Sequence, residues 1–237
     1  MPKESGRYCR LYYPPFTIGA SVSSMFYTFA PMQFTIWLNA WNTVRDWDRS
    51  IFIKLNSGWT NPIFDAVLPW VRNSAIWTPL YLFLFFFVVL NFKNKSIWWI
   101  VLFVTTIALT DMAGTNLFKH NFNRPRPCAD LDMHLYVRLL LDQCSGGKSF
   151  ISNHAANHFG MATFFYITFR KIIPKWTWLG FVWAGLIAYS QVYVGVHYPL
   201  DVFCGALVGM FSGIITGHTF NNRFGFAIFD KQPIGSS

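Results

Sequence analysis

Charged side chains are scarce in this sequence: Asp, Glu, Lys and Arg make up 12% of its 237 residues, whereas a soluble domain carries about 25%. So few charges cannot cover a surface that faces water. Apolar types reach 53%, which excludes intrinsic disorder. Acidic residues are the scarcer charged type, ten against 19 basic ones. In so apolar a chain the excess cations are expected at lipid headgroups or around a bound anion, and no nucleic-acid partner is expected.

The sequence contains five long apolar runs. Each approaches the roughly 20 residues that a helix needs to cross the hydrocarbon core of a bilayer. The runs cover residues 74–92, 97–118, 155–169, 176–196 and 199–220. Backbone polar groups in lipid must be hydrogen-bonded within the segment, so helices are predicted. The sequence therefore predicts an all-α, polytopic helical bundle that is integral to a membrane.

The N-terminal part has a weaker pattern. Residues 16–38 contain no charged side chain and are expected to form a sixth span, kinked at Pro31. Residues 45–59 mix charged and aromatic side chains, which predicts a short amphipathic helix in the interface. Residues 61–71 are too short to cross and are expected to be re-entrant or to extend the next helix. The expected parts are an N-terminal segment, a core and a C-terminal tail, residues 1–44, 45–220 and 221–237.

Six crossings place both termini on one side of the membrane. The two sides receive nearly equal numbers of cations, so the positive-inside rule separates them weakly. The short loops at 93–95 and 170–175 contain cations and no acids, which favours cytoplasmic termini. The polar loop at 119–150 is then expected at the outer face of a bacterial cytoplasmic membrane.

Three polar clusters fall at that same face, because successive helices alternate in direction. They cover residues 119–127, 152–158 and 190–201. Ionisable side chains near membrane depth are costly and are functional candidates by default. The clusters therefore mark a candidate site at the headgroup level.

The residue types in the first two clusters suit a phosphate group. Lys119 and Arg126 are positioned to neutralise its charge, Arg126 through a bidentate fork. Ser152 and the backbone amides of Asn153 and His154 stand where a helix begins, and unpaired N–H groups there favour an anion.

The third cluster contributes an imidazole with a supporting carboxylate. His197 and Asp201 are one helical turn apart, so Asp201 is expected to fix the tautomer of a nucleophilic or basic imidazole. His154 is then free to protonate a leaving oxygen. No cluster of Asp and Glu indicates a divalent metal, and no cofactor is expected.

Three short motifs occur in order with fixed internal spacing: Lys119-x6-Arg126-Pro127, Ser152-x-His154 and Ser190-x6-His197-x3-Asp201. Together they resemble the signature of the type-2 phosphatidic acid phosphatase family, whose site is shared with the vanadium-dependent haloperoxidases. The resemblance covers residues 48–217. It implies a metal-independent, six-helix membrane phosphatase whose partner is a lipid phosphate in the bilayer. Polyprenyl diphosphate, phosphatidylglycerol phosphate, phosphatidic acid and phosphorylated lipid A are the substrates that it leaves open.

The resemblance also implies a role for each residue of the motifs. His197 is expected to attack phosphorus and form a phosphohistidine, with Asp201 as its support. His154 is expected to be the general acid. The phosphoryl oxygens are assigned to Lys119, Arg126 and Ser152.

Two positions depart from the family pattern. Asn153 replaces the usual Gly, so its side chain either crowds the site or points away from it. Gln191 replaces the usual Arg and brings no charge, and Arg124 and Lys148 are the cations available to compensate. Because nucleophile, support and acid are present, we expect activity. A phosphotransferase that passes the phosphoryl group to a second lipid and a degenerate, non-catalytic member that binds lipid phosphate are the alternatives.

The outer loop contains two of the four cysteines, Cys128 and Cys144. A disulfide between them is expected, because the compartment outside the cytoplasmic membrane is oxidising. The sequence indicates no oligomeric state.

Overall fold

The structure is a computed structural model that describes residues 32–226. Its contacts divide the chain into two compact units, Met1–Arg45 and Asp46–Ser237. Most of the expected first span, residues 16–38, lies outside the described residues, as does most of the expected tail, residues 221–237. The three polar clusters all belong to the second unit.

The first described helix is longer than the sequence pattern predicts. Residues 45–59 form the end of α2 (Met32–Ile53) and the π-helical turn η1 (Lys54–Gly58), not a separate short helix. No Gly or Pro occurs within α2, so nothing in the backbone interrupts the helix before the charged residues begin.

The next helix, α3 (Pro62–Val71), is a separate element. The side chain of Asn61 accepts a hydrogen bond from the N–H of Ile63 at 2.8 Å, and Pro62 occupies the first helical turn. The helix ends at Arg72. Residues 61–71 therefore form a helix of their own and do not continue into the following span, and the re-entrant alternative stays a prediction.

The five apolar runs all form helices, which confirms the predicted all-α fold. They are η2 (Ser74–Trp77) with α4 (Thr78–Phe92), α5 (Asn94–Met112) with η3 (Ala113–Lys119), α6 (Asn153–Phe169), α7 (Leu179–Tyr193) and α8 (Pro199–Arg223). The loop between η3 and α6 contains one short turn, η4 (Pro127–Ala129). No strand occurs between residues 32 and 226.

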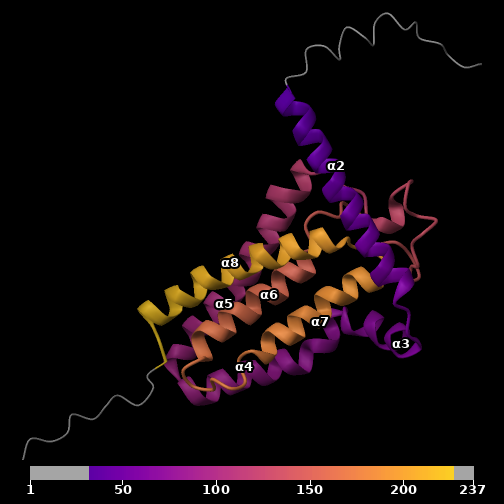
Figure 1. Cartoon of the computed structure of the whole chain (residues 1–237). Coiled ribbons are helices and arrows are strands. Elements are labelled where there is room, and N and C mark those ends of the chain that lie inside the picture. Colours follow the sequence, from indigo (N-terminus) through magenta and orange to yellow (C-terminus); the bar gives the residue numbers. More distant parts are fainter. Residues whose placement is uncertain (1–31, 227–237) are drawn as a thin grey trace, which may run out of the picture. The chain divides into compact units, whose positions relative to one another are not determined.

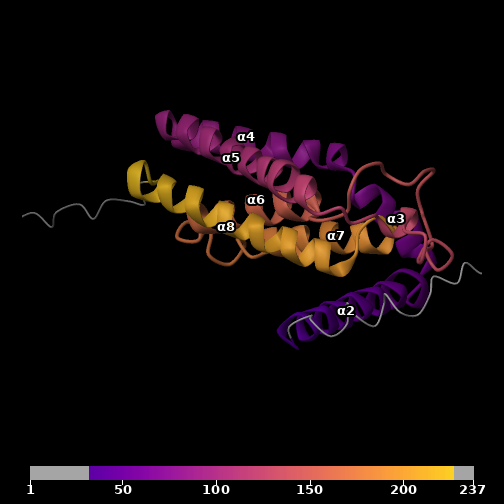
Figure 2. The same ribbon diagram turned by 90° about the horizontal axis from the view of Figure 1, so that it is seen from above.

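Between residues 32 and 226, three helical segments are long and apolar enough to cross a membrane, judged by length and composition. They are Ser74–Phe92, Asn94–Lys119 and Pro199–Arg223. The helices α6 and α7 are shorter, with 17 and 15 residues. Figures 1 and 2 show α6 within the bundle, where it contacts α5, α7 and α8.

The contact between α6 and α8 is made by backbone rather than by large side chains. A Cβ atom on Gly205 would lie 2.6 Å from the carbonyl oxygen of Ser152, and one on Gly213 would lie 2.5 Å from that of Gly160. Small residues four apart let two helices approach closely in a membrane, where burial of apolar surface adds little to their association. Gly205, Gly209 and Gly213 of α8 thus form a glycine seam against α6. The seam brings the first turns of α6 and α8 together, and the N–H of Ser152 donates to the carbonyl oxygen of Asp201 at 3.0 Å.

The glycine seam predicts a stability difference between two Gly→Ala variants. A Cβ atom on Gly209 would overlap the carbonyl oxygen of Ala156 on α6, whereas one on Gly185 in α7 meets nothing within 4 Å. Gly209→Ala is expected to lower the free energy of unfolding by about 1–3 kcal/mol, as overpacking does. Gly185→Ala, the matched control, is expected to be neutral or stabilising by up to ~1 kcal/mol, because Ala favours helix. Thermal unfolding midpoints of the detergent-purified variants check this, and equal midpoints would contradict the seam.

Candidate active site

The three polar clusters meet at one end of the bundle. The terminal nitrogen Nη1 of Arg126, from the first cluster, lies 3.1 Å from Nε2 of His197 in the third. The backbone bond between Ser152 and Asp201 joins the second cluster to the third. The convergence of distant motifs that the sequence predicts is therefore present in the structure.

His197 is held in a turn that its neighbours specify. Gly195 has a φ of +92°, a conformation that L side chains rarely adopt, and it reverses the chain between α7 and α8. The N–H of His197 donates to the carbonyl oxygen of Gln191 at 3.2 Å. Pro199 then starts α8 with a φ suited to the first helical position. These constraints fix the backbone on both sides of the imidazole.

The hydrogen bond from Arg126 identifies the tautomer of His197. A guanidinium only donates, so Nε2 of His197 must accept with its lone pair, and Nδ1 carries the proton. Burial lowers the pKa of His197 despite the opposing carboxylate of Asp201, and the positive charges of Arg126 and Lys119 lower it further. The imidazole is therefore neutral near pH 7, with an unprotonated Nε2 that is available as a nucleophile.

A serine that the sequence reasoning missed stands between His197 and Asp201. Nδ1 of His197 lies 3.7 Å from Oδ2 of Asp201, too far for a direct hydrogen bond, but 3.4 Å from the hydroxyl of Ser149. The same hydroxyl donates to Oδ2 of Asp201. Ser149 belongs to no motif, so the sequence offered no signal for it. The support that Asp201 gives to the imidazole thus passes largely through Ser149.

Arg124 occupies a different place from the one predicted. It was assigned to the phosphate, but its Nη1 donates to Asp201 at 2.6 Å and its Nη2 donates to Asp48. Its guanidinium also lies 4.1 Å from the centre of the Tyr198 ring. Two carboxylates satisfy its charge, so Arg124 positions Asp201 and offers no free charge to an anion. Asp48 is a further residue of this network that the sequence did not single out.

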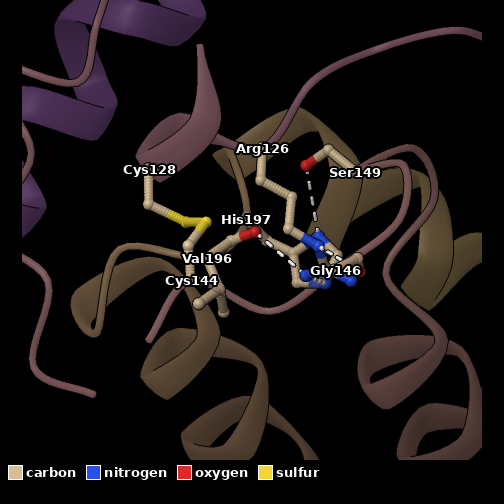
Figure 3. Close-up of a disulfide and its surroundings, with 7 residues drawn as sticks. All are labelled: Arg126, Cys128, Cys144, Gly146, Ser149, Val196 and His197. Atoms are coloured by element: carbon tan, nitrogen blue, oxygen red, sulfur yellow. Dashed lines mark hydrogen bonds between the residues drawn. A yellow bond between two sulfur atoms is a disulfide. The ribbon is translucent and has the colours of Figure 1, made fainter. Parts of the chain in front are cut away.

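Arg126, in contrast, has no carboxylate partner among the described residues. It donates to the carbonyl oxygens of Gly146 and Val196, each at 3.2 Å, as well as to His197 (Figure 3). Lys119 ends η3 and likewise forms no ion pair within residues 32–226. The site therefore contains positive charge that the protein itself does not neutralise.

Ser152 and Asn153, at the start of α6, have different roles. The first caps the helix, and the side chain of the second turns away from the site. Ser152 is fully buried, and its hydroxyl accepts from the N–H of Ala155 at 3.4 Å, which caps the helix. The amide of Asn153 donates to Asp111 at 3.1 Å and to Thr115 at 3.3 Å. Asn153 therefore turns toward α5 and η3 and leaves space where the family has Gly.

His154 follows in the first turn of α6, before the apolar run of that helix begins. Burial lowers the pKa of His154, and the positive charge of Arg72 is the next cause, followed by His158, His197 and Arg126. The centres of the His154 and His158 rings are 6.4 Å apart. An anion bound among them would supply the negative charge that raises this pKa again and lets His154 carry a proton.

His158 lies one turn further along α6 and packs against other groups. Its ring is edge-on to Trp183 at 4.8 Å, and its nitrogens contact the hydroxyl of Tyr81 and the carbonyl oxygen of His154. Packing and hydrogen bonding thus account for His158. No group of three or more His, Cys, Asp or Glu side chains in the described part of the chain is arranged to hold a metal ion.

A disulfide joins Cys128 and Cys144, whose Cα atoms are 5.8 Å apart (Figure 3). It closes residues 128–144, and Gly146, one of the carbonyl partners of Arg126, follows two residues after Cys144. The N–H of Ser149 donates to the carbonyl oxygen of Arg124 at 2.8 Å, which fixes the far end of the same loop. The disulfide and this hydrogen bond therefore hold the loop in place beside Ser149 and beside the guanidinium of Arg126.

The chain is similar to known proteins over most of its length. A family model described as the PAP2 superfamily matches residues 97–224. The chain is also 31% identical over 176 residues to a Bacteroides thetaiotaomicron protein named Lipid A 4'-phosphatase, which covers 71% of this chain and 74% of that relative.

Two solved structures have a similar fold. The crystal structure of Aquifex aeolicus LpxE matches with a TM-score of 0.53 and 30% identity, over 70% of this chain and 92% of that chain. A PAP2 type phosphatidylglycerolphosphate phosphatase from Bacillus subtilis matches with a TM-score of 0.60 and 21% identity, over 77% of this chain and 90% of that chain. The second likeness concerns the fold alone.

The disulfide makes a prediction about stability. Cys128→Ser is expected to lower the free energy of unfolding by ~3 kcal/mol in the chain-entropy model for a loop of this length. Cys204→Ser is the matched control, because Cys204 is a free cysteine. Peptide mapping without reductant is expected to find Cys128 and Cys144 cross-linked. Two free thiols in material purified from the membrane under oxidising conditions would contradict the pairing.

Proposed function

The chain belongs to the PAP2 superfamily and is a membrane lipid phosphatase, and from this premise we propose that it hydrolyses a phosphate monoester of a lipid A-type glycolipid through a phosphohistidine at His197. The similarity to the relative named Lipid A 4'-phosphatase supports this substrate class. Phosphatidic acid, phosphatidylglycerol phosphate and polyprenyl diphosphate are the other headgroups to be tested. The reacting residues lie within the proposed core, residues 45–220.

The unprotonated Nε2 of His197 carries the proposal. Its neighbour Arg126 offers charge that no carboxylate satisfies, and the guanidinium occupies the position from which it would hold a phosphoryl oxygen. An incoming phosphate would take over the hydrogen bonds of Arg126 and expose the lone pair of Nε2 to phosphorus. The protonated Nδ1 remains bonded toward Ser149 and Asp201, which stabilises the positive charge that the ring gains.

The first step forms the phosphohistidine. Nε2 of His197 attacks phosphorus, a P–N bond forms, and the bond from phosphorus to the sugar oxygen breaks. His154 donates a proton to that oxygen, so the lipid leaves as an alcohol. Arg126 and Lys119 hold the phosphoryl oxygens while their charge is redistributed.

The second step releases phosphate. Water attacks phosphorus, and His154 accepts a proton from it. The P–N bond breaks and its electron pair returns to Nε2 of His197. The products are inorganic phosphate and the neutral imidazole, so the site is ready for another substrate.

An apolar groove supports a substrate with hydrocarbon chains. The groove has a volume of about 440 Å³ and lies between α4, α6 and α7. Tyr81 and Trp183 line it and also contact His158, one turn from His154. A hydrocarbon chain in the groove would therefore leave its polar headgroup beside the proposed general acid.

We further propose that the site faces the periplasm from the cytoplasmic membrane. The Cys128–Cys144 pair supports this, because disulfides persist in oxidising compartments such as the periplasm and are rare in the cytosol. The basic loops at 93–95 and 170–175 support the opposite, cytoplasmic face for the other end of the helices. The oxidation state of the two cysteines in intact cells tests the orientation.

Phosphate release from a panel of purified lipids tests the proposed function. The wild-type protein in EDTA is expected to release phosphate from bisphosphorylated lipid A faster than from the other three headgroups, with mass spectrometry locating the position that is lost. His197→Ala is expected to abolish release, because no other group replaces Nε2. His218→Ala is the matched control, since His218 is exposed at the opposite end of α8.

Each contrary outcome has a distinct meaning. Preference for another headgroup would overturn the lipid A assignment while leaving phosphatase activity in place. Loss of activity in EDTA would indicate a metal. Transfer of the phosphoryl group to an added acceptor lipid would identify a phosphotransferase. Release at only the background rate by both the wild type and His197→Ala would leave only lipid-phosphate binding.

The position of Ser149 generates a separate prediction. Ser149→Ala removes the hydroxyl that links His197 to Asp201, and we expect kcat to fall by about 10- to 100-fold, as for the loss of one hydrogen bond to a charged group. KM is expected to change little, because Ser149 faces Nδ1 and not the phosphate. Ser50→Ala is the control, since Ser50 bonds only the backbone of Asp46. An unchanged kcat would show that Asp201 supports His197 without the serine.

A further inference from the structure

Gln191 is the position where this chain lacks a cation that its family has. Its side chain is 0% exposed, and its Nε2 has no hydrogen-bond partner among the described residues. Its backbone carbonyl accepts the N–H of His197 at 3.2 Å, so it lies next to the proposed nucleophile. A buried amide donor without a partner is costly unless a ligand satisfies it.

The other end of the same amide binds an arginine from a different helix. Oε1 of Gln191 accepts from Nε of Arg72 at 3.4 Å. Arg72 ends α3, and α3 is fastened to α7 through Asp65, which accepts from the hydroxyl of Tyr193 at 2.6 Å. The fold thus brings the guanidinium of Arg72 into contact with the side chain that stands where the family has an arginine.

The charge of Arg72 and the N–H donors of its two terminal nitrogens are not satisfied by any described residue. No carboxylate in the described part of the chain lies within ion-pair distance of it, and no hydrogen bond from its two terminal nitrogens is present there. Arg49, Arg124 and Arg138, in contrast, each bind at least one aspartate. Burial lowers the pKa of Arg72 because the half-buried guanidinium loses hydration. Keeping this cation half-buried therefore costs folding free energy.

Arg72 also acts on the reacting groups. Burial and then the charge of Arg72 lower the pKa of Arg126. The same two causes, in the same order, lower the pKa of His154. The charge of Arg72 thus bears on both a proposed phosphate-binding cation and the proposed general acid, and its guanidinium is bound to Gln191, whose carbonyl oxygen accepts from His197.

We propose that Arg72 and Gln191 together form a phosphoryl-binding pair that replaces the absent motif arginine. Gln191 orients Arg72 through Oε1, the terminal nitrogens of Arg72 bind a phosphoryl oxygen, and Nε2 of Gln191 donates to the same group. The pair rests on the proposed function, because it binds the phosphate that His197 attacks. Arg124 does not fill this role, since it is bound to Asp48 and Asp201.

Two variants test the pair through different atoms. Arg72→Gln removes the charge, and Gln191→Glu keeps the shape but places a carboxylate against Arg72 that neutralises it. Each is expected to lower kcat/KM for the lipid phosphate by roughly 10- to 100-fold, the factor for one lost charge-assisted hydrogen bond. Arg170→Gln is the matched control, because Arg170 is exposed at the other end of the bundle, and it is expected to match the wild type.

Orthovanadate provides a readout that needs no turnover. It mimics a tetrahedral phosphate, so it is expected to raise the thermal unfolding midpoint of the wild type and of Arg170→Gln. The rise is expected to be much smaller in Arg72→Gln and Gln191→Glu. A residue with only a structural role would lower the midpoint without vanadate and leave the vanadate-induced rise unchanged.

The outcomes separate the inference from the proposed function. If the wild type is active and both variants keep its kcat/KM and its vanadate-induced rise, the pair is refuted and the function stands. If no lipid phosphate is hydrolysed but the variants still lose the vanadate effect, the function is refuted and the anion-binding pair stands. Should Arg72→Gln fail to fold, the nearly isosteric Gln191→Glu decides alone.

Discussion

The close approach of the α6 and α8 backbones is the contact on which the rest of the site depends. Glycines on α8 let the two helices meet at a distance that any Cβ atom would prevent. One hydrogen bond, from Ser152 to the carbonyl of Asp201, then joins their first turns. His154 lies in the first turn of α6 and His197 directly precedes α8, so this contact brings the two imidazoles to the same end of the bundle.

The charges around the site fall into two groups with different consequences. Arg49, Arg124 and Arg138 are paired with carboxylates, and they fasten the outer loop and hold Asp201 in place. Arg126 and Lys119, whose positive charges lower the pKa of His197, have no such partner in the described residues. An arginine that two carboxylates already satisfy adds little attraction for a phosphate, whereas an unpaired, half-buried one is costly to the fold and gains most from a bound anion. The pairing of each cation therefore indicates its role better than its position in a motif does.

Much of this architecture is predictable from the sequence, for identifiable reasons. The helices of the bundle follow from uninterrupted apolar runs, and the meeting of the three motifs follows from the alternating direction of the helices. Arg124 was misplaced because the sequence shows a cation near the site but not the carboxylates that reach it. Ser149, Asp48 and Arg72 escaped notice because each lies outside the motifs and is brought to the site by loop or helix packing. Residues 45–53 continue a longer helix, which the sequence did not predict because a change in hydrophobic pattern marks a change of environment, whereas a backbone breaker marks the end of a helix.

The glycine seam also bears on how such a protein diversifies. Because carbonyl and Cα atoms set the spacing of α6 and α8, the outward faces of α4 and α7 are free to exchange one bulky side chain for another without moving the imidazoles. Adaptation to a thicker bilayer, or to longer or branched acyl chains, then requires changes only in the side chains on the outside of the bundle. The reacting residues stay the same. Selection for fit to the membrane and selection for turnover then act on separate sets of codons.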